Sequence, residues 1–332
     1  MKKVLILQNQ GKIYGGVWQV NKLVGEGLIE KGYNVHIVSI RDSKMNIVLE
    51  HHNDLVVKTI NEVDDWETYH LVDLIDEFKK FHLFKVIGIL FSKIKYNVSL
   101  RNDIKKLHKY IYEYDPDYIV TSHYQLIDMV PKEYLDRTIH EQHSSLNDAI
   151  NHRATKESFD KYKDKIKFLW LTKKTMDNAI CMGYKNSLYI YNAVRFKSDI
   201  RSNVVNNKKL VAIARLSKDK SIDKMIEIVM DIFKDNKYKD WSLELYGSGE
   251  CENALRDMIG DNKQIKLMGV TNNPKEVLLT SSISLNTSKY EGFSLSVLEA
   301  NECGVPTVAF DFGESTQELI IDGKTGIIAK DK

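Results

Sequence analysis

Short apolar runs alternate with amphipathic stretches along most of the chain. Residues 4–7 and 35–40 are apolar runs typical of strands that are buried on both faces of a parallel sheet. Between these runs apolar residues recur at helical spacing, and Gly32 then ends the predicted helix. The residues expected on the buried face of this helix are Val17, Val20, Leu23, Val24 and Leu28. Further strands of this first series are predicted at residues 118–122, 137–139, 168–172 and 188–193.

A second series of alternating strands and helices begins at residues 210–214. Apolar side chains follow helical spacing from residue 222 to residue 233, which indicates an amphipathic helix. Later strands are predicted at residues 243–246, 265–269, 283–285 and 307–311. The chain has 332 residues, more than one core usually serves. Because residues 195–209 are polar and without a period, we predict an N-terminal α/β domain at 1–194, a linker at 195–209 and a C-terminal α/β domain at 210–332.

Composition narrows the class of protein. With 43% hydrophobic and 28% charged residues the chain can bury a core, and a net charge of +2 argues against a general nucleic-acid binder. The three cysteines, Cys181, Cys251 and Cys303, are widely spaced and fit neither a disulfide framework nor a zinc pattern. The apolar run after Met1 is too short for a signal peptide or a membrane span. We therefore expect a cytoplasmic protein.

Residues 78–96 differ in character from their surroundings. Phenylalanines and lysines interleave there, and no acidic residue occurs. Its lysines are Lys79, Lys80, Lys85, Lys93 and Lys95. A basic, aromatic-rich segment can lie in the interface of an anionic membrane, on the inner face of the cell membrane in this case. A core-packing helix whose lysine stems lie along the surface is the alternative. Nucleic-acid binding is a third interpretation, but nothing resembling a nucleic-acid module accompanies the segment.

Residues 284–306 carry the most informative pattern of the sequence. Ser294 stands where a helix N-cap is expected, and Gly304 and Pro306 stand just beyond the end of that helix. The first backbone N–H groups of such a helix attract anions, and Gly292 lets the chain approach a ligand closely. A phosphate group is the expected ligand of this loop.

Two carboxylates flank the predicted helix start. Glu291 precedes the helix and Glu299 lies within it, roughly 7 Å further along the axis. An isolated pair of glutamates at this spacing is common on solvated helices. Here the whole string resembles the pattern E-G-F-x-x-x-x-x-E-A-x-x-x-G-x-P of the retaining nucleotide-sugar glycosyltransferases of family 4, which have an E-x7-E signature. Every fixed position of that pattern matches.

Other segments resemble the same family over nearly the whole chain, loosely only between residues 41 and 97. Residues 214–221 are similar to its G-R-L-x-x-x-K-G string, in which the arginine and the lysine hold the donor diphosphate; Arg215 and Lys220 keep both charges, whereas Ala214 and Ser221 replace the glycines. In isolation this run would be interpreted as a solvated basic loop. Cations at the carboxyl end of a strand nevertheless stand where open α/β sheets bind ligands.

Four further residues take roles from this resemblance. Gly15 and Gly16 match a Gly-Gly loop that faces the donor phosphates and the acceptor, although a tight turn alone would also explain two glycines. Gly247 matches a G-x-G loop on the donor side. His143 follows the pattern E-x-H-x, whose histidine faces the donor sugar; a hydrogen-bonded loop histidine is the alternative.

The resemblance implies the GT-B fold, an α/β architecture of two Rossmann-like domains with mostly parallel sheets that face each other across a cleft. It implies transfer of a hexose or N-acetylhexosamine from a nucleotide diphosphate sugar, a UDP-sugar above all, with retention of anomeric configuration. Arg215, Lys220 and the helix start at Phe293, Ser294 and Leu295 would stabilise the departing diphosphate. Glu291 and the amides after it would hold the sugar hydroxyls, and Glu299 would hold the ribose. It implies neither a metal nor another cofactor. Asp115-Pro116-Asp117 is interpreted as a turn rather than a metal motif.

The acceptor and the exact sugar are not encoded in any recognisable pattern. By family analogy we expect a hydroxyl of a bacterial cell-surface glycan, a teichoic-acid-like polymer or a lipid-linked saccharide. A non-catalytic nucleotide-sugar-binding partner of a glycosyltransferase complex is the main alternative, because the family's usual C-terminal helices do not follow residue 328. A glycoside hydrolase also uses two carboxylates, but these must flank one bond.

Overall fold

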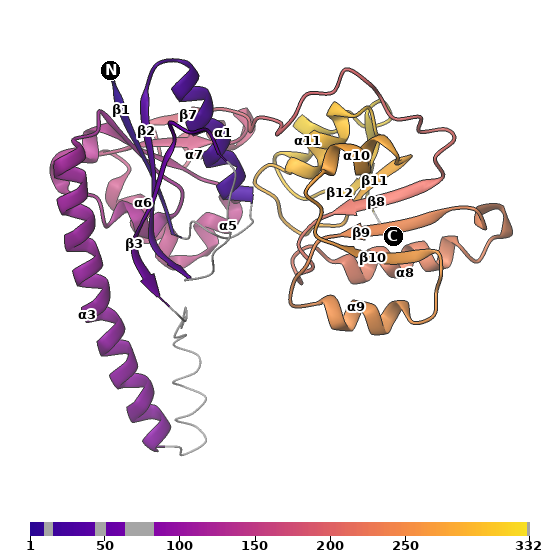
Figure 1. Cartoon of the computed structure of the whole chain (residues 1–332), viewed down its shortest axis with the longest axis horizontal. Helices are drawn as coiled ribbons and strands as arrows, with labels where there is room; N and C mark the ends of the chain where they lie inside the picture. The colour runs from indigo at the N-terminus through magenta and orange to yellow at the C-terminus, as the bar shows by residue number, and fades with distance from the viewer. Residues whose placement is uncertain (10–15, 44–50, 64–82, 331–332) are drawn as a thin grey trace. The chain divides into compact units, whose positions relative to one another are not determined.

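The computed structural model describes residues 1–9, 16–43, 51–63 and 83–330. Its contacts divide the chain into two compact units. Unit 1 comprises Met1–Glu141 and Glu157–Phe168, and unit 2 comprises Gln142–Lys156 and Leu169–Lys332. Two sheets of parallel strands form the framework (Figure 1). The first ends at Tyr189 and the second begins at Lys209. Residues 195–208 of the linker predicted at 195–209 therefore lie between the two sheets in the sequence, and the role of this linker as a domain boundary stays a prediction.

The first sheet has seven strands in the order β3-β2-β1-β4-β5-β6-β7. Their bounds are β1 Lys3–Gln8, β2 Asn34–Ser43, β3 Val56–Val63, β4 Tyr118–Thr121, β5 Thr138–Glu141, β6 Lys167–Trp170 and β7 Ser187–Tyr189. The central strands are fully buried, as their continuous apolar runs predict: Leu5, Ile6, Leu7, Ile37 and Val38 are all inaccessible to solvent. Strands β1 and β2 therefore lie in the interior of the parallel sheet and are covered on both faces.

Helix α1, Gly16–Glu30, joins β1 to β2, but its buried face differs from the predicted one. The buried residues are Trp18, Val20, Asn21 and Gly25, whereas Val24 is 39% exposed. The predicted face was wrong at Val24 because Gly25 provides the close approach: a Cβ at Gly25 would lie 3.0 Å from Leu55. A glycine on the packing face is not visible to a count of apolar residues.

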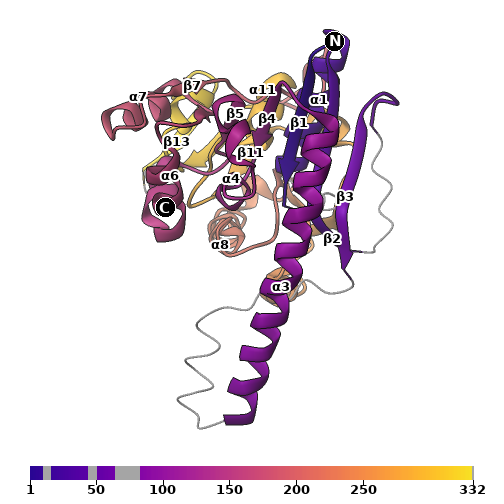
Figure 2. The same cartoon turned by 90° about the vertical axis from the view of Figure 1, so that its left-hand side faces the viewer.

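Helix α3, Leu83–Tyr114, packs along β2 and β3 (Figure 2). A buried ion pair fixes it there, with 2.6 Å between Arg41 and Asp103. Of the basic segment 78–96, residues 78–82 and the side chains of the remainder lie outside the described part of the chain, so its membrane interaction stays a prediction. Among the described residues, no helix combines the length and the hydrophobicity needed to cross a membrane.

Shorter helices complete the first part of the chain. They are α4 Tyr124–Ile127, α5 Leu146–Asn151, α6 Arg153–Tyr162 and α7 Lys173–Cys181, with a 3-10 turn at Lys132–Arg137. The segment Asp115-Pro116-Asp117 joins α3 to β4 outside any helix or strand, and Asp115 has a positive φ of 47°. The Asp117 carboxylate accepts a hydrogen bond of 2.7 Å from the N–H of Lys3 at the start of β1. Asp117 therefore serves the strand start.

The second sheet has six strands in the order β10-β9-β8-β11-β12-β13. Their bounds are β8 Lys209–Ile213, β9 Ser242–Tyr246, β10 Ile265–Gly269, β11 Ile283–Asn286, β12 Thr307–Phe310 and β13 Gly326–Ala329. The strand β8 lies at the centre, and the strand order reverses between β8 and β11. In an open parallel sheet, ligands bind beyond the carboxyl ends of the strands at such a reversal.

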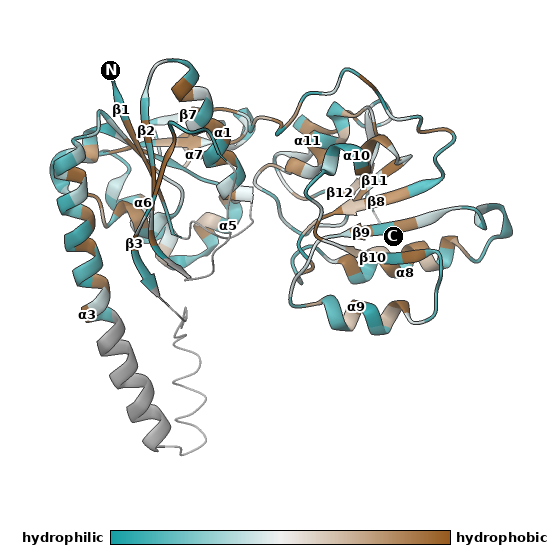
Figure 3. Cartoon of the chain, in the orientation of Figure 1, coloured by the Kyte–Doolittle hydropathy of each residue, from teal (hydrophilic) through white to brown (hydrophobic). Residues whose placement is uncertain are grey.

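Helices cover both faces of this second sheet (Figure 1). On one face α8, Ile222–Ile232, and α9, Glu252–Ile259, pack on Leu210, Leu243 and Leu245. On the other face α10, Pro274–Leu279, and α11, Leu295–Glu302, pack on Val211. Hydrophobic and hydrophilic residues alternate along α8 and α9 (Figure 3), which is the amphipathic pattern of helices with one buried side. The short elements η2, Asn236–Tyr238, and α12, Thr316–Leu319, complete the unit.

Candidate active site

Two loops meet beyond the carboxyl ends of β8 and β11, where the strand order reverses. The first follows Ile213 and contains Arg215 and Lys220; the second follows Asn286 and contains Glu291. Backbone and side-chain hydrogen bonds join them: the N–H of Lys289 donates to the carbonyl of Asp219 at 2.9 Å, and the Thr287 hydroxyl lies 2.9 Å from the carbonyl oxygen of Lys220. The predicted diphosphate and sugar residues therefore share one site.

Lys220 and Glu291 form an ion pair in this site. The Lys220 Nζ lies 2.7 Å from Glu291 Oε1, and the Ser288 hydroxyl donates to the same oxygen at 2.8 Å. Both charged side chains are mostly buried, with exposed fractions of 15% and 17%. Arg215, by contrast, is 67% exposed, and its Nε lies 3.2 Å from the Ser217 hydroxyl. A phosphate that enters here would meet one partly sheltered cation and one open cation.

Asp219 lies between the two cations. Its Oδ2 is 3.5 Å from Arg215 Nη2 and 3.8 Å from Lys220 Nζ. The Ser217 hydroxyl donates to its other oxygen at 2.5 Å. Partial burial raises the pKa of the Asp219 carboxyl, but the hydrogen bond from Ser217 and the charges of Lys220 and Arg215 outweigh burial, so this pKa lies below its ordinary value. Asp219 is therefore ionised at neutral pH.

The G-x-G loop after β9 packs against the backbone of the Arg215 loop. Gly247 has φ +146°, and a Cβ there would lie 1.8 Å from the carbonyl oxygen of Ala214. The next residue, Ser248, accepts a hydrogen bond of 2.9 Å from the N–H of Leu216. Only glycine allows this backbone contact. The role of Gly247 in the structure is to place the Arg215 loop, and direct donor contact stays a prediction.

The residue after Lys220 has an unusual backbone. Ser221 is the N-cap of α8 and has φ 48° and ψ 43°, in the left-handed region that favours glycine. Its carbonyl oxygen lies 2.9 Å from the Thr287 hydroxyl, which the carbonyl of Lys220 shares. The position where the family pattern has glycine therefore needs a left-handed conformation, and here a serine adopts it.

The start of α11 partly matches the prediction. Ser294 is the N-cap residue, but its side chain makes no capping hydrogen bond, so the predicted cap was wrong in that respect. The hydroxyl is occupied elsewhere: Asn286 Nδ2 donates to it at 3.1 Å. In the described part of the chain, the N–H groups of Phe293, Ser294 and Leu295 donate to no protein acceptor. They remain available to a ligand, as expected of a helix start.

Phe293 and Gly292 contribute through the backbone. The ring of Phe293 is buried in a cluster with Leu171 and Val297, so the group that Phe293 can offer to a ligand is its backbone N–H. At Gly292, a Cβ would lie 2.0 Å from the carbonyl oxygen of His143, which belongs to the same unit 2. The structure thus brings His143 beside the Glu291 loop, whereas its proposed sugar contact remains a prediction.

Glu299 has surroundings different from those of Glu291. Its side chain is 0% exposed, and both carboxylate oxygens bind the guanidinium of Arg195, with 2.7 Å between Arg195 Nη2 and Glu299 Oε2. Sequence reasoning placed Arg195 in a polar linker and missed this partner. A bidentate pair across 104 residues leaves no local signal in the sequence.

The two remaining predicted residues, Gly15 and Gly16, lie apart from this description. Gly15 is outside the described residues, and Gly16 is the first residue of α1 in unit 1. The roles of both glycines toward a donor stay predictions.

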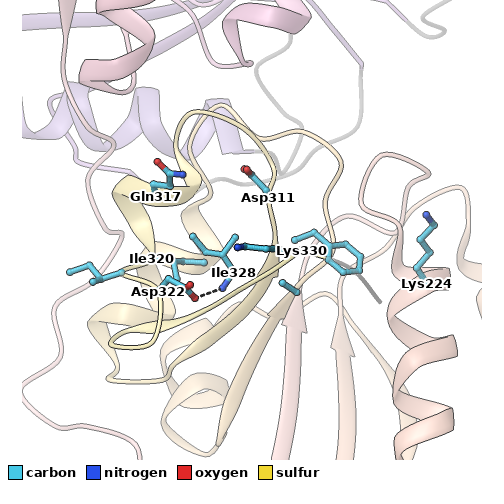
Figure 4. Close-up of a pocket in the computed structure, with 10 residues that line it drawn as sticks. Lys224, Asp311, Gln317, Ile320, Asp322, Ile328 and Lys330 are labelled. Atoms are coloured by element: carbon cyan, nitrogen blue, oxygen red, sulfur yellow. Dashed lines mark hydrogen bonds between the residues drawn. The ribbon is translucent and has the colours of Figure 1, made fainter.

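A hollow of about 850 Å³ occurs elsewhere in unit 2, between α12, β13 and α8 (Figure 4). It is lined by Lys224, Phe310, Asp311, Gln317, Ile320, Ile321, Asp322, Ile328, Ala329 and Lys330. None of these is a predicted site residue, and Asp322 is occupied by the N–H of Ile328 at 2.9 Å. We therefore place the candidate site at the converging charged loops rather than at this hollow.

Solved structures identify the fold. A structure of TarM from S. aureus matches with a TM-score of 0.75 at 14% identity, over 99% of this chain and 89% of that chain. HepE from Anabaena, in complex with UDP and glucose, matches with a TM-score of 0.69 at 15% identity, over 99% and 86%. WaaG, a glycosyltransferase involved in lipopolysaccharide biosynthesis, gives 0.66 at 11%, over 98% and 85%. The chain has the GT-B fold, as predicted.

Sequence relatives point to the same class. Residues 195–332 match the family Glycosyl transferases group 1. The poly(glycerol-phosphate) alpha-glucosyltransferase of Bacillus subtilis is 24% identical over 205 residues, which cover 60% of this chain and 30% of the relative. The poly(ribitol-phosphate) alpha-N-acetylglucosaminyltransferase of Staphylococcus aureus is 33% identical over 120 residues, covering 35% and 24%. The chain spans less than half the length of these curated relatives. Together, fold and matches support a GT-B glycosyltransferase.

Proposed function

We propose that this protein transfers a sugar, glucose or N-acetylglucosamine, from a UDP-sugar to a hydroxyl of a cell-surface polymer, with retention of anomeric configuration. The observation that carries the proposal is the pairing of Lys220 with Glu291 at the strand reversal, beside Arg215 and the open N–H groups of α11. Two cations and a helix start suit a diphosphate, and a carboxylate a few ångströms away suits sugar hydroxyls.

The proposed chemistry follows from where negative charge develops. As the glycosidic bond breaks, the departing diphosphate gains charge, and Arg215, Lys220 and the N–H groups of Phe293 to Leu295 stabilise it. Glu291 holds the sugar, and the phosphate oxygen takes the acceptor proton on the same face. In this proposal Glu299 holds the ribose, and the His143 side chain faces the donor sugar. No metal ion is required for these steps.

The acceptor proposal rests on the named relatives. Their names specify α-linked transfer to poly(glycerol-phosphate) and poly(ribitol-phosphate). An α product from an α-linked UDP-sugar is retention. We therefore propose a polyol-phosphate polymer or a related envelope glycan as the acceptor, with the protein in the cytoplasm and residues 78–96 at the inner membrane surface.

The test is transfer by the purified chain from UDP-glucose and UDP-N-acetylglucosamine to polyol-phosphate polymers. Lys220→Ala should lower turnover by about 100-fold, because it removes a charge that stabilises the leaving diphosphate. Lys224→Ala, which removes the same charge from the exposed side of α8, is the matched control and should keep the native rate. A metal chelator should leave the rate of the native chain and of both variants unchanged.

A non-catalytic nucleotide-sugar-binding subunit is the second candidate, because cations and helix N–H groups can bind a diphosphate without catalysing transfer. Titration with UDP separates the two. UDP binding without transfer or donor hydrolysis would favour the binding subunit, and an equal loss for the Lys220 and Lys224 variants would place the diphosphate elsewhere.

A further inference from the structure

Among the charged side chains that pair with one another in the candidate site, two are positive and two are negative. Arg215 and Lys220 supply the cations, and Asp219 and Glu291 supply the anions, all within the two converging loops. Glu291 has a proposed task at the sugar. Asp219 has none, although a carboxylate beside a phosphate site opposes the ligand that the site is built to bind.

The hydrogen bonds that fix Asp219 are shorter than its distances to the two cations. The Ser217 hydroxyl donates to it at 2.5 Å, and its backbone carbonyl accepts from Lys289 at 2.9 Å. Its distances to the cations, 3.5 and 3.8 Å, are longer than the 2.7 Å of the Lys220–Glu291 pair. The Asp219 side chain is 40% exposed, so it is not a buried carboxylate that needs the two cations as ion-pair partners. Asp219 is a fixed negative charge near both cations and a weak anchor for either.

We propose that Asp219 is a counter-charge that limits the affinity of the site for the nucleoside diphosphate product and so speeds its release. The inference rests on the proposed function and adds a product-release role at the same site. A free nucleoside diphosphate carries about one more negative charge than the same diphosphate esterified to a sugar, because its terminal phosphate ionises with a second pKa of about 6. A fixed carboxylate therefore repels the product more than it repels the donor.

This arrangement serves turnover. A site that bound the diphosphate equally tightly before and after transfer would gain no rate and would retain its product. Arg215 and Lys220 attract the diphosphate. After the sugar has been transferred, the negative charge of Asp219 offsets part of the attraction between these cations and the diphosphate product. Asp219 touches no reacting atom in this scheme and acts through the field at the two cations.

The experiment compares Asp219→Asn with the native chain by calorimetric titration of UDP, UDP-glucose, inorganic pyrophosphate and uridine. Asparagine keeps the shape and can still accept from Ser217. We expect UDP and pyrophosphate to bind about five- to tenfold tighter to the variant, UDP-glucose to gain less, and uridine to be unchanged. The gain should shrink at high salt, where exposed charges are screened. In kinetics, product inhibition by UDP should strengthen by the same factor.

Two controls sharpen the result. Asp219→Glu should bind UDP as the native chain does, and Asp223→Asn, in the first turn of α8, removes an equal charge outside the site and should change nothing. Weaker UDP binding by Asp219→Asn would mean that Asp219 positions the cations, and would overturn the proposal. Equal changes for UDP and uridine would overturn it as well. Native protein that binds neither UDP nor pyrophosphate would overturn the proposed function together with this inference.

Discussion

The two glutamates of the E-x7-E stretch share one chemistry and have opposite surroundings. Glu291 stands in a loop, partly exposed, with Lys220 and the Ser288 hydroxyl on one oxygen. Glu299 lies inside α11 without exposure, with both oxygens on Arg195. The Glu291 pair can exchange partners when a ligand arrives, whereas the Glu299 pair must be broken inside the protein. The same sequence stretch thus contains one partly exposed carboxylate in a loop and one buried carboxylate that an ion pair holds inside the protein.

The largest expected effect is on stability. Glu299→Ala should lower the free energy of unfolding by about 3 kcal/mol, because it leaves the Arg195 guanidinium without its buried partner. Denaturant unfolding measures this loss. Glu252→Ala, which breaks the exposed Arg256–Glu252 pair on α9, is the control and should cost about 0.5 kcal/mol or less. A loss for Glu299→Ala no larger than that of the control would show that burial does not separate the two glutamates.

The next effect is on transfer. Glu291→Gln should lower turnover by about tenfold or more while UDP binds at least as tightly as before, because the change removes a sugar contact and also a negative charge beside Lys220. Initial rates beside UDP titration measure both. Glu252→Gln on α9 serves as the control with unchanged rate and affinity. Loss of UDP affinity by Glu291→Gln would place Glu291 on the nucleotide and contradict this assignment.

The smallest effect concerns Ser288. Ser288→Ala removes one of two hydrogen-bond donors to Glu291 Oε1. The rate of transfer should fall about two- to threefold, and the free energy of unfolding should fall by about 1 kcal/mol or less. Rates and denaturant unfolding test this together. If the rate falls as far as it does for Glu291→Gln, the hydroxyl and not Lys220 sets the orientation of the carboxylate.

Much of the fold follows from the pattern of apolar residues. The strands at 4–7, 35–40 and 210–214 and the helix from residue 222 are local features, and the structure confirms them. The strand β3 was missed because its apolar residues, at positions 56, 57, 60 and 63, do not alternate with polar ones, so the segment lacks the period of a strand. The helix α9 was missed because only Leu255 and Ile259 of its eight residues are buried. Short elements with few core contacts carry a weak periodic signal.

The candidate site divides in the same way. Arg215, Lys220 and Glu291 could be proposed because their strings are local, and the structure brings Lys220 and Glu291 together across 71 residues. The partners Arg195 and Asp219 were not found, because an ion pair depends on which side chains tertiary packing places side by side. Sequence spacing predicts the loops of this site and does not predict how the charges within them pair.

The left-handed conformation of Ser221 bears on how such proteins are found. A search pattern that requires glycine after the lysine would reject this chain, although its backbone keeps φ 48° with the Thr287 hydroxyl against the carbonyls of Lys220 and Ser221. What the site requires at this position is a dihedral angle, and the residue type is only its usual means. A pattern that allows asparagine, aspartate and the serine of this chain beside glycine would therefore match sequences that a strict string leaves out.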